Sequence, residues 1–486
     1  MGRAVPDSLP SGGRGVNRCG ILVARVVPSP YGGPVPAPAL NAEIVATAAD
    51  AAARWIALRR ERLQVPGVQL AVRLDGELLH SSAHGSADLE RGVALTPQHV
   101  FRVASHSKTF TATAVLRLAE QGRLRLDDEL GAHLPWVADE DGELGRASLR
   151  ELLGHAAGVT RDGTAGDFWQ LDEEFLDVAG LRTAVRAGGS LVPRSSRFKY
   201  SNIGYSLLGL VVEAVTGTSY AAHLSELLAP WGLSRTTPDL PAAGDLATGY
   251  SALALGPRRP LPHPATGAMA AATGFCSTAE DLTAWFTSHA DGREGPLSEH
   301  SRRLAQRAEW RTGPGAGAYG LGFGRDEVGG RELVGHGGGF PGHITRSVLD
   351  PRAGLAVSVL TNCVDGPANE FALGVVKLVD LFAEHWSAQV PAVDLDAFCG
   401  RWADLWGLTD VVRAGGRLLA FGPDTDDPAR SPKVLDVVDA RTLRVSDDSG
   451  YGDHAETWLL GARADGTPTL RGSSGATTVP LDRYAP

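Results

Sequence analysis

The stretch Phe101-Arg-Val-Ala-Ser-His-Ser-Lys-Thr-Phe110 places a serine, Ser105, three residues before a lysine, Lys108. The apolar residues that follow keep helical spacing as far as Gly122, a residue typical of a helix C-terminus. In a helix, residues i and i+3 share a face, so we expect the Lys108 amine beside the Ser105 hydroxyl. The helix dipole stabilises an anion at its N-terminus, and a buried lysine loses its proton easily. The pair is therefore a candidate nucleophile and base.

This spacing is a weak signal by itself. Ser196-Arg-Phe-Lys199 has the same spacing, but no amphipathic helix begins at Ser196, so we interpret it as a loop serine. The alternative for Ser105 is a helix cap without a catalytic role. Further residues are needed to decide between these readings.

Tyr200-Ser-Asn202 precedes a segment with helical spacing that begins near Tyr205. A phenol beside a cationic lysine has a lowered pKa and can carry a proton to a leaving group. The Asn202 amide can hold the lysine and a substrate carbonyl. A core tyrosine and a capping asparagine are the alternatives for these residues.

A glycine-rich segment, Val334-Gly-His-Gly-Gly-Gly-Phe-Pro-Gly342, surrounds His336. We expect a loop whose glycines let a substrate approach the backbone and whose N–H groups can complete an oxyanion hole. The alternative is a structural histidine. The segment also fits the dinucleotide pattern G-x-G-x-x-G, but a hairpin strand rather than a helix follows it, so we reject that interpretation.

Taken together and in this order, Ser105-x-x-Lys108, Tyr200-x-Asn202 and His336-x-Gly338 resemble the motifs of the penicillin-recognising serine enzymes. This family includes class C β-lactamases, D,D-peptidases, D-aminopeptidases and related esterases. The resemblance covers about residues 42–388. Four further segments are similar to recurring segments of the family: Ser105 to Ala114, Leu152 to Val159, Ala272 to Leu282 and Tyr319 to Phe323.

The resemblance implies a role for each motif residue. Ser105 would attack a carbonyl and become acylated, while Lys108 and Tyr200 move its proton and Asn202 orients lysine and substrate. The backbone N–H groups of Ser105 and Gly339 would form the oxyanion hole, with Gly338 in the substrate-binding strip. His336 stands where many relatives carry the lysine of Lys-Thr-Gly, which removes a permanent cation suited to a β-lactam carboxylate and disfavours an efficient β-lactamase.

The pattern along the chain predicts an α+β fold. Helices are expected over 44–63 and 370–386, with hairpins over 68–84 and 344–361, so one antiparallel sheet should form from both ends of the domain around a helical middle. With the resemblance, this becomes a β-lactamase/transpeptidase-like domain over 42–388, after a Pro- and Gly-rich extension over 1–41 that we expect to be disordered.

The tail over 393–486 reads as short strands separated by Gly/Asp turns and resembles the lipocalin-like β-barrel of D-aminopeptidases and of penicillin-binding-protein-type thioesterases. In such enzymes the barrel can cover the active-site cleft. Arg471 would then reach a substrate carboxylate, although a solvated surface arginine is the alternative.

Composition excludes several classes of protein. The net charge of -10 disfavours nucleic acid as a partner. No apolar run is long enough to span a membrane, and neither a metal cluster nor a cofactor motif occurs, so no cofactor is expected. Four widely spaced cysteines and a first segment unlike a signal peptide predict a cytoplasmic protein.

Three functions remain open. A serine acyl-enzyme that off-loads and macrocyclises a nonribosomal peptide thioester with a D-residue at its acyl end is the function we expect. Its partner would be a peptidyl-thioester substrate on a peptidyl carrier protein. The alternatives are a D-stereospecific peptidase or esterase and a binding module without turnover. The absence of an export signal, the single barrel and an apolar cover that excludes water favour the cyclase.

Overall fold

The computed structural model describes residues 37–241, 245–313, 317–448 and 452–485. The predicted helices and hairpins are present as α1 (Ala42–Arg62), β1 (Gly67–Leu74), β2 (Glu77–Asp88), β12 (His343–Asp350), β13 (Leu355–Thr361) and α13 (Ala368–His385). Asp75 and Gly76 both have positive φ, at 51° and 86°, the geometry that a tight two-residue hairpin requires.

Within the described residues, nine antiparallel strands form the main sheet in the order β3-β2-β1-β13-β12-β11-β10-β9-β8. Strand β1 pairs directly with β13, with Val68 opposite Thr361, so the two ends of the domain meet in the middle of the sheet as predicted. The remaining strands of the sheet are β3 (Val93–Ala94), β8 (Trp310–Arg311), β9 (Ala318–Tyr319), β10 (Gly324–Val328) and β11 (Arg331–Phe340).

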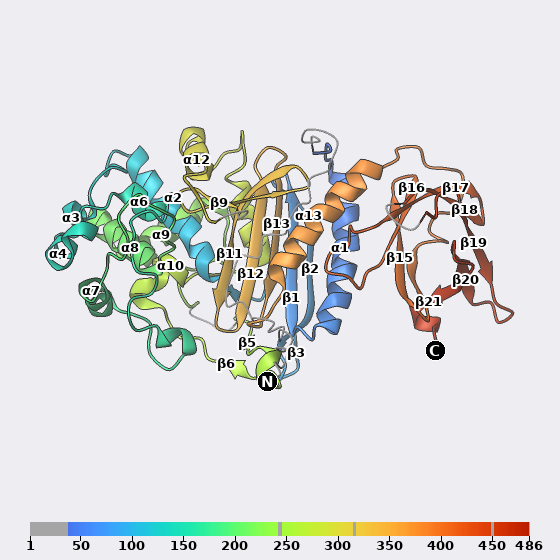
Figure 1. Ribbon diagram of the computed structural model, residues 1–486, viewed down its shortest axis with the longest axis horizontal. Coiled ribbons are helices and arrows are strands. Elements are labelled where there is room, and N and C mark those ends of the chain that lie inside the picture. Colours follow the sequence, from blue (N-terminus) through green and yellow to red (C-terminus); the bar gives the residue numbers. More distant parts are fainter. Residues whose placement is uncertain (1–36, 242–244, 314–316, 449–451, 486) are drawn as a thin grey trace, which may run out of the picture.

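The sheet separates two hydrophobic cores because successive strand residues point to opposite faces. Leu70 and Val72 pack with α1 and α13, whereas Ala71 between them belongs to the core shared with the helical middle of the chain. Figure 1 shows this arrangement, with the helical middle on one side of the sheet and α1 and α13 on the other.

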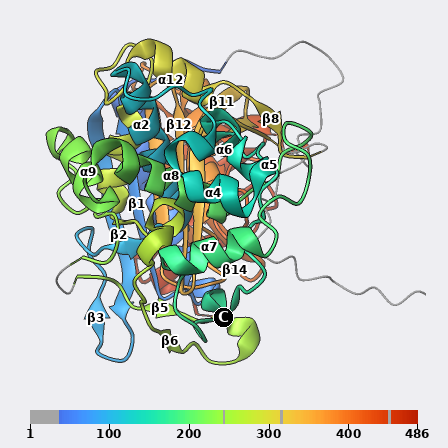
Figure 2. The ribbon, with the colours of Figure 1, turned by 90° about the vertical axis from the view of Figure 1, so that its left-hand side faces the viewer.

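The helical middle forms the layer that faces the viewer in Figure 2, in front of the sheet. Its central helix, α8, is apolar and largely buried against α2 and α10. The α-helices of this part are α2 (Ser107–Glu120), α3 (Leu130–His133), α4 (Pro135–Glu140), α5 (Gly142–Gly145), α6 (Leu149–Leu153), α7 (Val178–Arg186), α8 (Asn202–Thr216), α9 (Tyr220–Leu228), α10 (Ala270–Thr273), α11 (Ala279–Thr287) and α12 (Glu299–Gln306).

Short elements connect these helices. Two small ladders are β4 (Phe101–Arg102) with β7 (Cys276–Ser277) and β5 (Gly249–Tyr250) with β6 (Pro260–Leu261). Single 3₁₀ turns are η1 (Ala104–His106), η2 (Asp167–Gln170), η3 (Ala229–Trp231), η4 (Leu253–Leu255), η5 (Gly267–Met269) and η6 (Leu481–Arg483).

In the described part of the tail, eight antiparallel strands close into a barrel in sequence order. Each strand pairs with the next, and the last pairs with the first, with Ala403 opposite Val479. The strands are β14 (Gly400–Asp404), β15 (Gly407–Ala414), β16 (Arg417–Phe421), β17 (Lys433–Asp439), β18 (Thr442–Asp448), β19 (Thr457–Ala462), β20 (Pro468–Arg471) and β21 (Thr477–Pro480).

The barrel packs on α1 and α13, on the side of the sheet away from the helical middle (Figure 1). Trp55 of α1 is fully buried, lies edge-on to Phe371 of α13 and donates its indole N–H to the Thr425 carbonyl of the barrel at 3.0 Å. Gly374 permits this packing, because a Cβ there would come within 2.4 Å of the Trp55 ring. The buried apolar contact and the hydrogen bond from Trp55 to Thr425 together hold the barrel against α1 and α13.

Residues 1–36 of the extension predicted to be disordered lie outside the described residues. The rest of it makes defined contacts, because Asn41 caps α1 through the Ile44 N–H and the Pro38 carbonyl accepts from Arg331.

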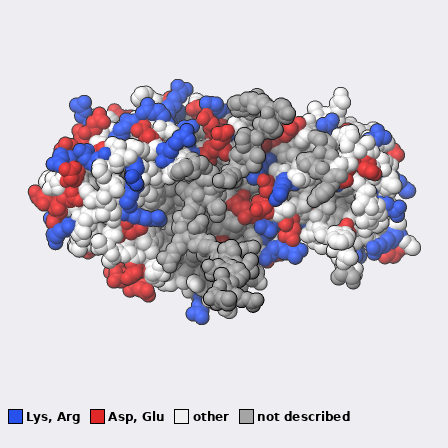
Figure 3. Space-filling model, in the orientation of Figure 1, with Lys and Arg blue, Asp and Glu red and all other residues white. Residues whose placement is uncertain are grey.

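Of the residues described, no single helix is long and apolar enough to cross a membrane; α8 and the segment Tyr220–Trp231 meet that test only together, bent by 82°. Acidic and basic side chains are interspersed over the face in Figure 3.

Candidate active site

Ser105 lies in η1, at the turn that leads from β4 into α2. Ala104 before it has a φ of +47°, a left-handed conformation that is strained for a residue other than glycine. The Val103 N–H donates to the Phe275 carbonyl at 2.9 Å, and the Phe275 N–H donates to Ser107 Oγ at 3.0 Å. These bonds hold the strained turn and place the half-buried Ser105 hydroxyl at the start of a helix.

The Lys108 side chain is fully buried and reaches three acceptors. Its Nζ lies 3.2 Å from Ser105 Oγ, 2.8 Å from Asn202 Oδ1 and 2.7 Å from the Ala272 carbonyl. Burial lowers the pKa of Lys108 well below its usual value, and the Arg161 charge lowers it further, while Asp162 opposes the shift. A neutral amine can donate to Asn202 and Ala272 and turn its lone pair toward the Ser105 hydroxyl.

Tyr200 approaches the same hydroxyl from the loop before α8. Its phenol donates to Ser105 Oγ at 2.9 Å, and Lys108 Nζ lies 4.8 Å from the centre of its ring. His155 lies against the ring with the centroids 4.3 Å apart. The structure therefore brings together the serine, lysine and tyrosine that the sequence singled out.

Asn202 is the first residue of α8, and its amide is oriented from both ends. Its Oδ1 accepts from Lys108, and its Nδ2 donates to Asp162 Oδ1 at 2.7 Å. The Asp162 carboxylate can only accept, so Nδ2 must face it and Oδ1 is left to accept an N–H of the Lys108 amine. Asp162 was not singled out in the sequence, and no motif around it signals this contact.

His336 lies in strand β11, where the sequence predicted a loop. The prediction was wrong because the glycine-rich segment pairs with β12, with His336 opposite Ser347. The His336 Nδ1 donates to the Gly337 carbonyl at 2.6 Å, which leaves Nε2 to accept from the Tyr319 phenol at 3.0 Å. Burial lowers the pKa of His336 well below 6.5, so the ring is neutral at physiological pH.

Gly338 and the candidate oxyanion-hole residue Gly339 lie in the second half of β11. Pairing with β10 ends at Gly335, so Gly338 and Gly339 lie beyond the end of β10 and next to η1. A Cβ on Gly338 would stand 2.1 Å from the Val103 carbonyl oxygen, so no side chain fits there. The Ser105 and Gly339 N–H groups remain the predicted oxyanion donors.

Arg471 does not reach this site. It is exposed at the end of β20, and the barrel that carries it packs behind α1 and α13, across the sheet from Ser105. The prediction that the barrel covers the cleft is therefore wrong for this chain, because its apolar contact surface binds the back of the sheet. Arg471 matches the alternative of a solvated surface arginine.

The buried rings of Tyr319 and His155 pack beside the site. Tyr319 and His155 lie within two of the recurring segments, and their ring centroids are 4.9 Å apart. The His155 Nδ1 accepts from the Ser201 N–H at 3.1 Å, and this bond holds the loop that carries Tyr200. The sequence resemblance pointed to both segments but gave neither residue a role.

The remaining candidates are accounted for. Ser196 lies in a loop and donates to the Pro193 carbonyl, in agreement with its interpretation as a loop serine. No group of three His, Cys, Asp or Glu side chains that could hold a metal ion occurs in the part of the chain that the structure describes.

Comparisons with known proteins identify the family. The family model described as Beta-lactamase matches residues 52–380, and the chain belongs to this family of serine hydrolases. Penicillin-binding protein 4 of Amycolatopsis lactamdurans is 31% identical over 70% of this chain and 91% of its own length. D-aminopeptidase of Brucella anthropi is 30% identical over 78% of this chain and 71% of its own length.

Solved structures confirm the predicted fold class. The structure of SurE is 26% identical, with a TM-score of 0.58, and covers 91% of this chain and 100% of SurE. The D-amino acid amidase of Ochrobactrum anthropi SV3 is 26% identical, with a TM-score of 0.58, and covers 69% of this chain and 98% of its own. The octameric penicillin-binding protein homologue from Pyrococcus abyssi shares the fold at a TM-score of 0.61, 20% identity and coverages of 88% and 99%.

Proposed function

We propose that this chain is a D-stereospecific peptidase, amidase or esterase that works through an acyl-enzyme at Ser105. The observation that carries the proposal is the contact of one hydroxyl with two proton carriers. Ser105 Oγ lies 3.2 Å from the Lys108 amine and 2.9 Å from the Tyr200 phenol. These distances are within the reach needed for general acid–base catalysis.

The proposed chemistry follows from these contacts. Ser105 Oγ attacks the substrate carbonyl and gives its proton to the neutral Lys108 amine, and Tyr200 passes a proton to the leaving amine, alcohol or thiol. A water molecule then attacks the acyl-enzyme and gives a proton to the Tyr200 phenolate, while the Lys108 ammonium returns a proton to Ser105 Oγ as the free acid leaves. The Ser105 and Gly339 N–H groups would stabilise the oxyanion in both steps.

The preference for a D-residue rests on relatives. The names of two relatives, D-aminopeptidase and D-amino acid amidase, point to D-configured acyl groups. Beside Ser105, Ala104 joins an apolar cluster with Phe168, Phe175, Met269 and Phe340. These side chains are buried, so they pack beneath the turn that carries Ser105.

Hydrolysis is favoured over cyclisation because the barrel lies behind the sheet and leaves the Ser105 side of the domain uncovered by it. An acyl-enzyme open to water is expected to hydrolyse. A β-lactam is a poor candidate substrate, since the neutral His336 provides no cation for its carboxylate.

The peptide cyclase expected from the sequence remains the second candidate, and the layout of the chain favours it. The described residues contain one barrel, as the resemblance to stand-alone penicillin-binding-protein-type thioesterases implies. In that case the substrate's own amine, rather than water, would attack the acyl-enzyme. The acyl donor would be a peptidyl thioester on a carrier protein.

One experiment separates these functions. The purified protein is incubated with a linear peptide N-acetylcysteamine thioester that has a C-terminal D-residue, and the masses of the products are measured by mass spectrometry. A linear acid supports the hydrolase, whereas loss of the thiol without gain of water identifies the cyclase. The epimer with a C-terminal L-residue tests stereospecificity. If Ser105→Ala reacts as fast as the unchanged protein, both proposals are refuted.

A further inference from the structure

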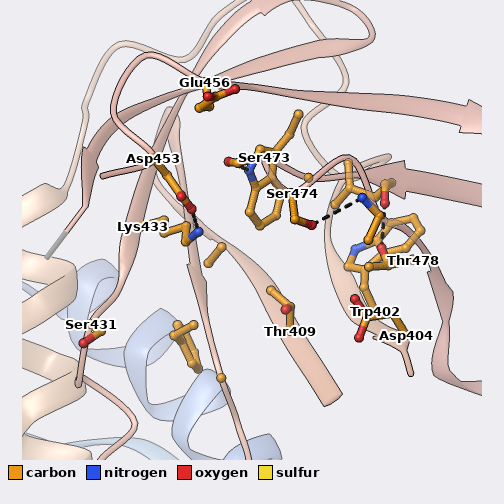
Figure 4. Close-up of a pocket in the computed structure, with 17 residues that line it drawn as sticks. Trp402, Asp404, Thr409, Ser431, Lys433, Asp453, Glu456, Ser473, Ser474 and Thr478 are labelled. Carbon is orange, nitrogen blue, oxygen red and sulfur yellow. Dashed lines mark hydrogen bonds and ion pairs between the residues drawn. The ribbon is translucent and has the colours of Figure 1, made fainter. Parts of the chain in front are cut away.

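The barrel contains a cavity of about 320 Å³ that is separate from the serine site. It opens at the end of the barrel where β14 connects to β15, β16 to β17, β18 to β19 and β20 to β21. Its volume lies at the lower end of the range for small-molecule sites. Figure 4 shows side chains from several strands pointing into it.

The cavity exists because small residues occupy positions near this end of the barrel. Thr409, Ala476 and Thr478 line it together with Gly472 and Ser473 at the β20–β21 turn. The interior of an eight-stranded barrel is just wide enough to be filled by side chains or to hold one small ligand. Here the small residues leave room beside the larger apolar side chains of the barrel core.

The floor of the cavity is aromatic. Trp402 and Trp458 belong both to the barrel core and to the cavity lining. Their indole N–H groups are already bonded, one to the Phe398 carbonyl at 2.9 Å and the other to Ser473 Oγ at 3.0 Å. The indoles therefore offer apolar ring surface rather than hydrogen-bond donors to a ligand.

The charged groups of the lining are mainly acidic. Three carboxylates, those of Asp404, Asp453 and Glu456, and one ammonium, that of Lys433, line the cavity. Asp404 lies across the cavity from the others and accepts from the Trp406 and Gly407 N–H groups. Lys433 forms an ion pair with Asp453 and lies 5.9 Å from the centre of the Trp458 ring. The charges of the lining are therefore net negative. The Lys433 ammonium near the Trp458 ring shows that this ring is accessible to a cation.

One wall of the cavity is attached to the main domain. The β16–β17 connection provides Gly422 and Ser431 to the lining, and between them Asp424 lies 3.6 Å from Arg59 of α1. At the β14–β15 turn, Leu405 and Trp406 are 79% and 90% exposed. The wall is thus held in place, while apolar surface remains available next to the Asp404 side of the lining.

We propose that this cavity binds a small organic cation, an amine that carries a flat apolar group. The ammonium would lie beside the Glu456 carboxylate at the rim, and the apolar group would lie on the Trp458 ring, which is two residues further along the chain and lines the same side of the cavity. The site lies across the sheet from Ser105, so its ligand does not compete with the acyl donor.

The test uses isothermal titration calorimetry on the full chain with three probes of one shape: phenethylamine, 2-phenylethanol and phenylacetate. We expect one equivalent of phenethylamine to bind at least about tenfold more tightly than phenylacetate, with an affinity that falls as salt is added. Ser105→Ala should bind it unchanged. Equal or tighter binding of phenylacetate, or preferential binding of a fatty acid, overturns the proposal.

Variants locate the binding. Ala476→Phe fills the cavity without a change of charge and should abolish binding. Glu456→Gln, at an exposed position, should weaken it about tenfold or more even if the first variant folds poorly. The matched control is Asp465→Asn, in an exposed turn at the opposite end of the barrel. Binding that survives in a folded Ala476→Phe protein, or that falls equally in the control, places the ligand elsewhere.

Discussion

Gly338→Ala offers a sharp test of the reasoning about the site, because the crowding at this position can be stated in ångströms. The new Cβ would lie 2.1 Å from the Val103 carbonyl oxygen and 2.4 Å from Thr345 Oγ1. An ordinary contact is 3.4 Å or longer, so β11 and η1 must separate by about 1.3 Å. A displacement of that size between the nucleophile and the oxyanion donors costs about 100-fold in rate.

The assay is kcat/KM for a D-amino acid p-nitroanilide or ester, with thermal unfolding measured in parallel. We expect kcat/KM to fall about 100-fold while overpacking costs about 1–3 kcal/mol of stability. Gly337→Ala is the matched control, since its Cβ would meet nothing nearer than the Thr345 carbonyl oxygen at 3.6 Å. If both variants keep nearly full activity, or both lose it equally, the proposed contact between β11 and η1 does not position the reacting groups.

Further predictions concern the proton carriers and the buried histidines. Lys108→Met removes the base and should lower the acylation rate about 1,000-fold, measured in a stopped-flow burst, without loss of the fold; a rate within tenfold of the unchanged protein would exclude lysine as the base. Asp162→Asn removes a charge that raises the pKa of Lys108, so the acid limb of the kcat/KM profile should move to lower pH, and movement to higher pH contradicts this role. Burial lowers the pKa of His106 to about 3 and of His289 to about 4, below the unfolded value of 6.5. Their stabilisation is therefore complete above pH 6.5 and is lost as the pH falls, by about 2 kcal/mol each near pH 5; a urea midpoint unchanged between neutral pH and pH 5 would refute it.

The agreement between sequence and site is best where the contacts are local. Ser105 and Lys108 meet because three residues of helical backbone separate them, and the amphipathic pattern of α2 is readable without any other part of the chain. Tyr200 and His336 were found through their motifs, since nothing in their own neighbourhoods states that they lie near Ser105. Their convergence depends on the packing of α8 and β11 against η1 and α2.

The sequence missed contacts that have no local pattern. Asp162 orients Asn202 across a separation of 40 residues, and a lone aspartate in a loop looks like any solvated turn residue. The loop expected around His336 is a strand, because glycines weaken strand propensity while pairing with β12 overrides it. The roles of these residues in the reaction stay predictions until variants are measured.

By itself, the sequence determined the α+β fold class and an antiparallel sheet built from both ends of the domain, because periodicity and turn chemistry carry that information within a few neighbouring residues. The resemblance of three motifs to a known family identified the candidate nucleophile and its base. Only the tertiary structure decided where the barrel lies, because that depends on which apolar surfaces meet, and Trp55 with its neighbours on α1 and α13 binds the barrel behind the sheet. That placement keeps Arg471 away from Ser105 and leaves Ser105 uncovered by the barrel.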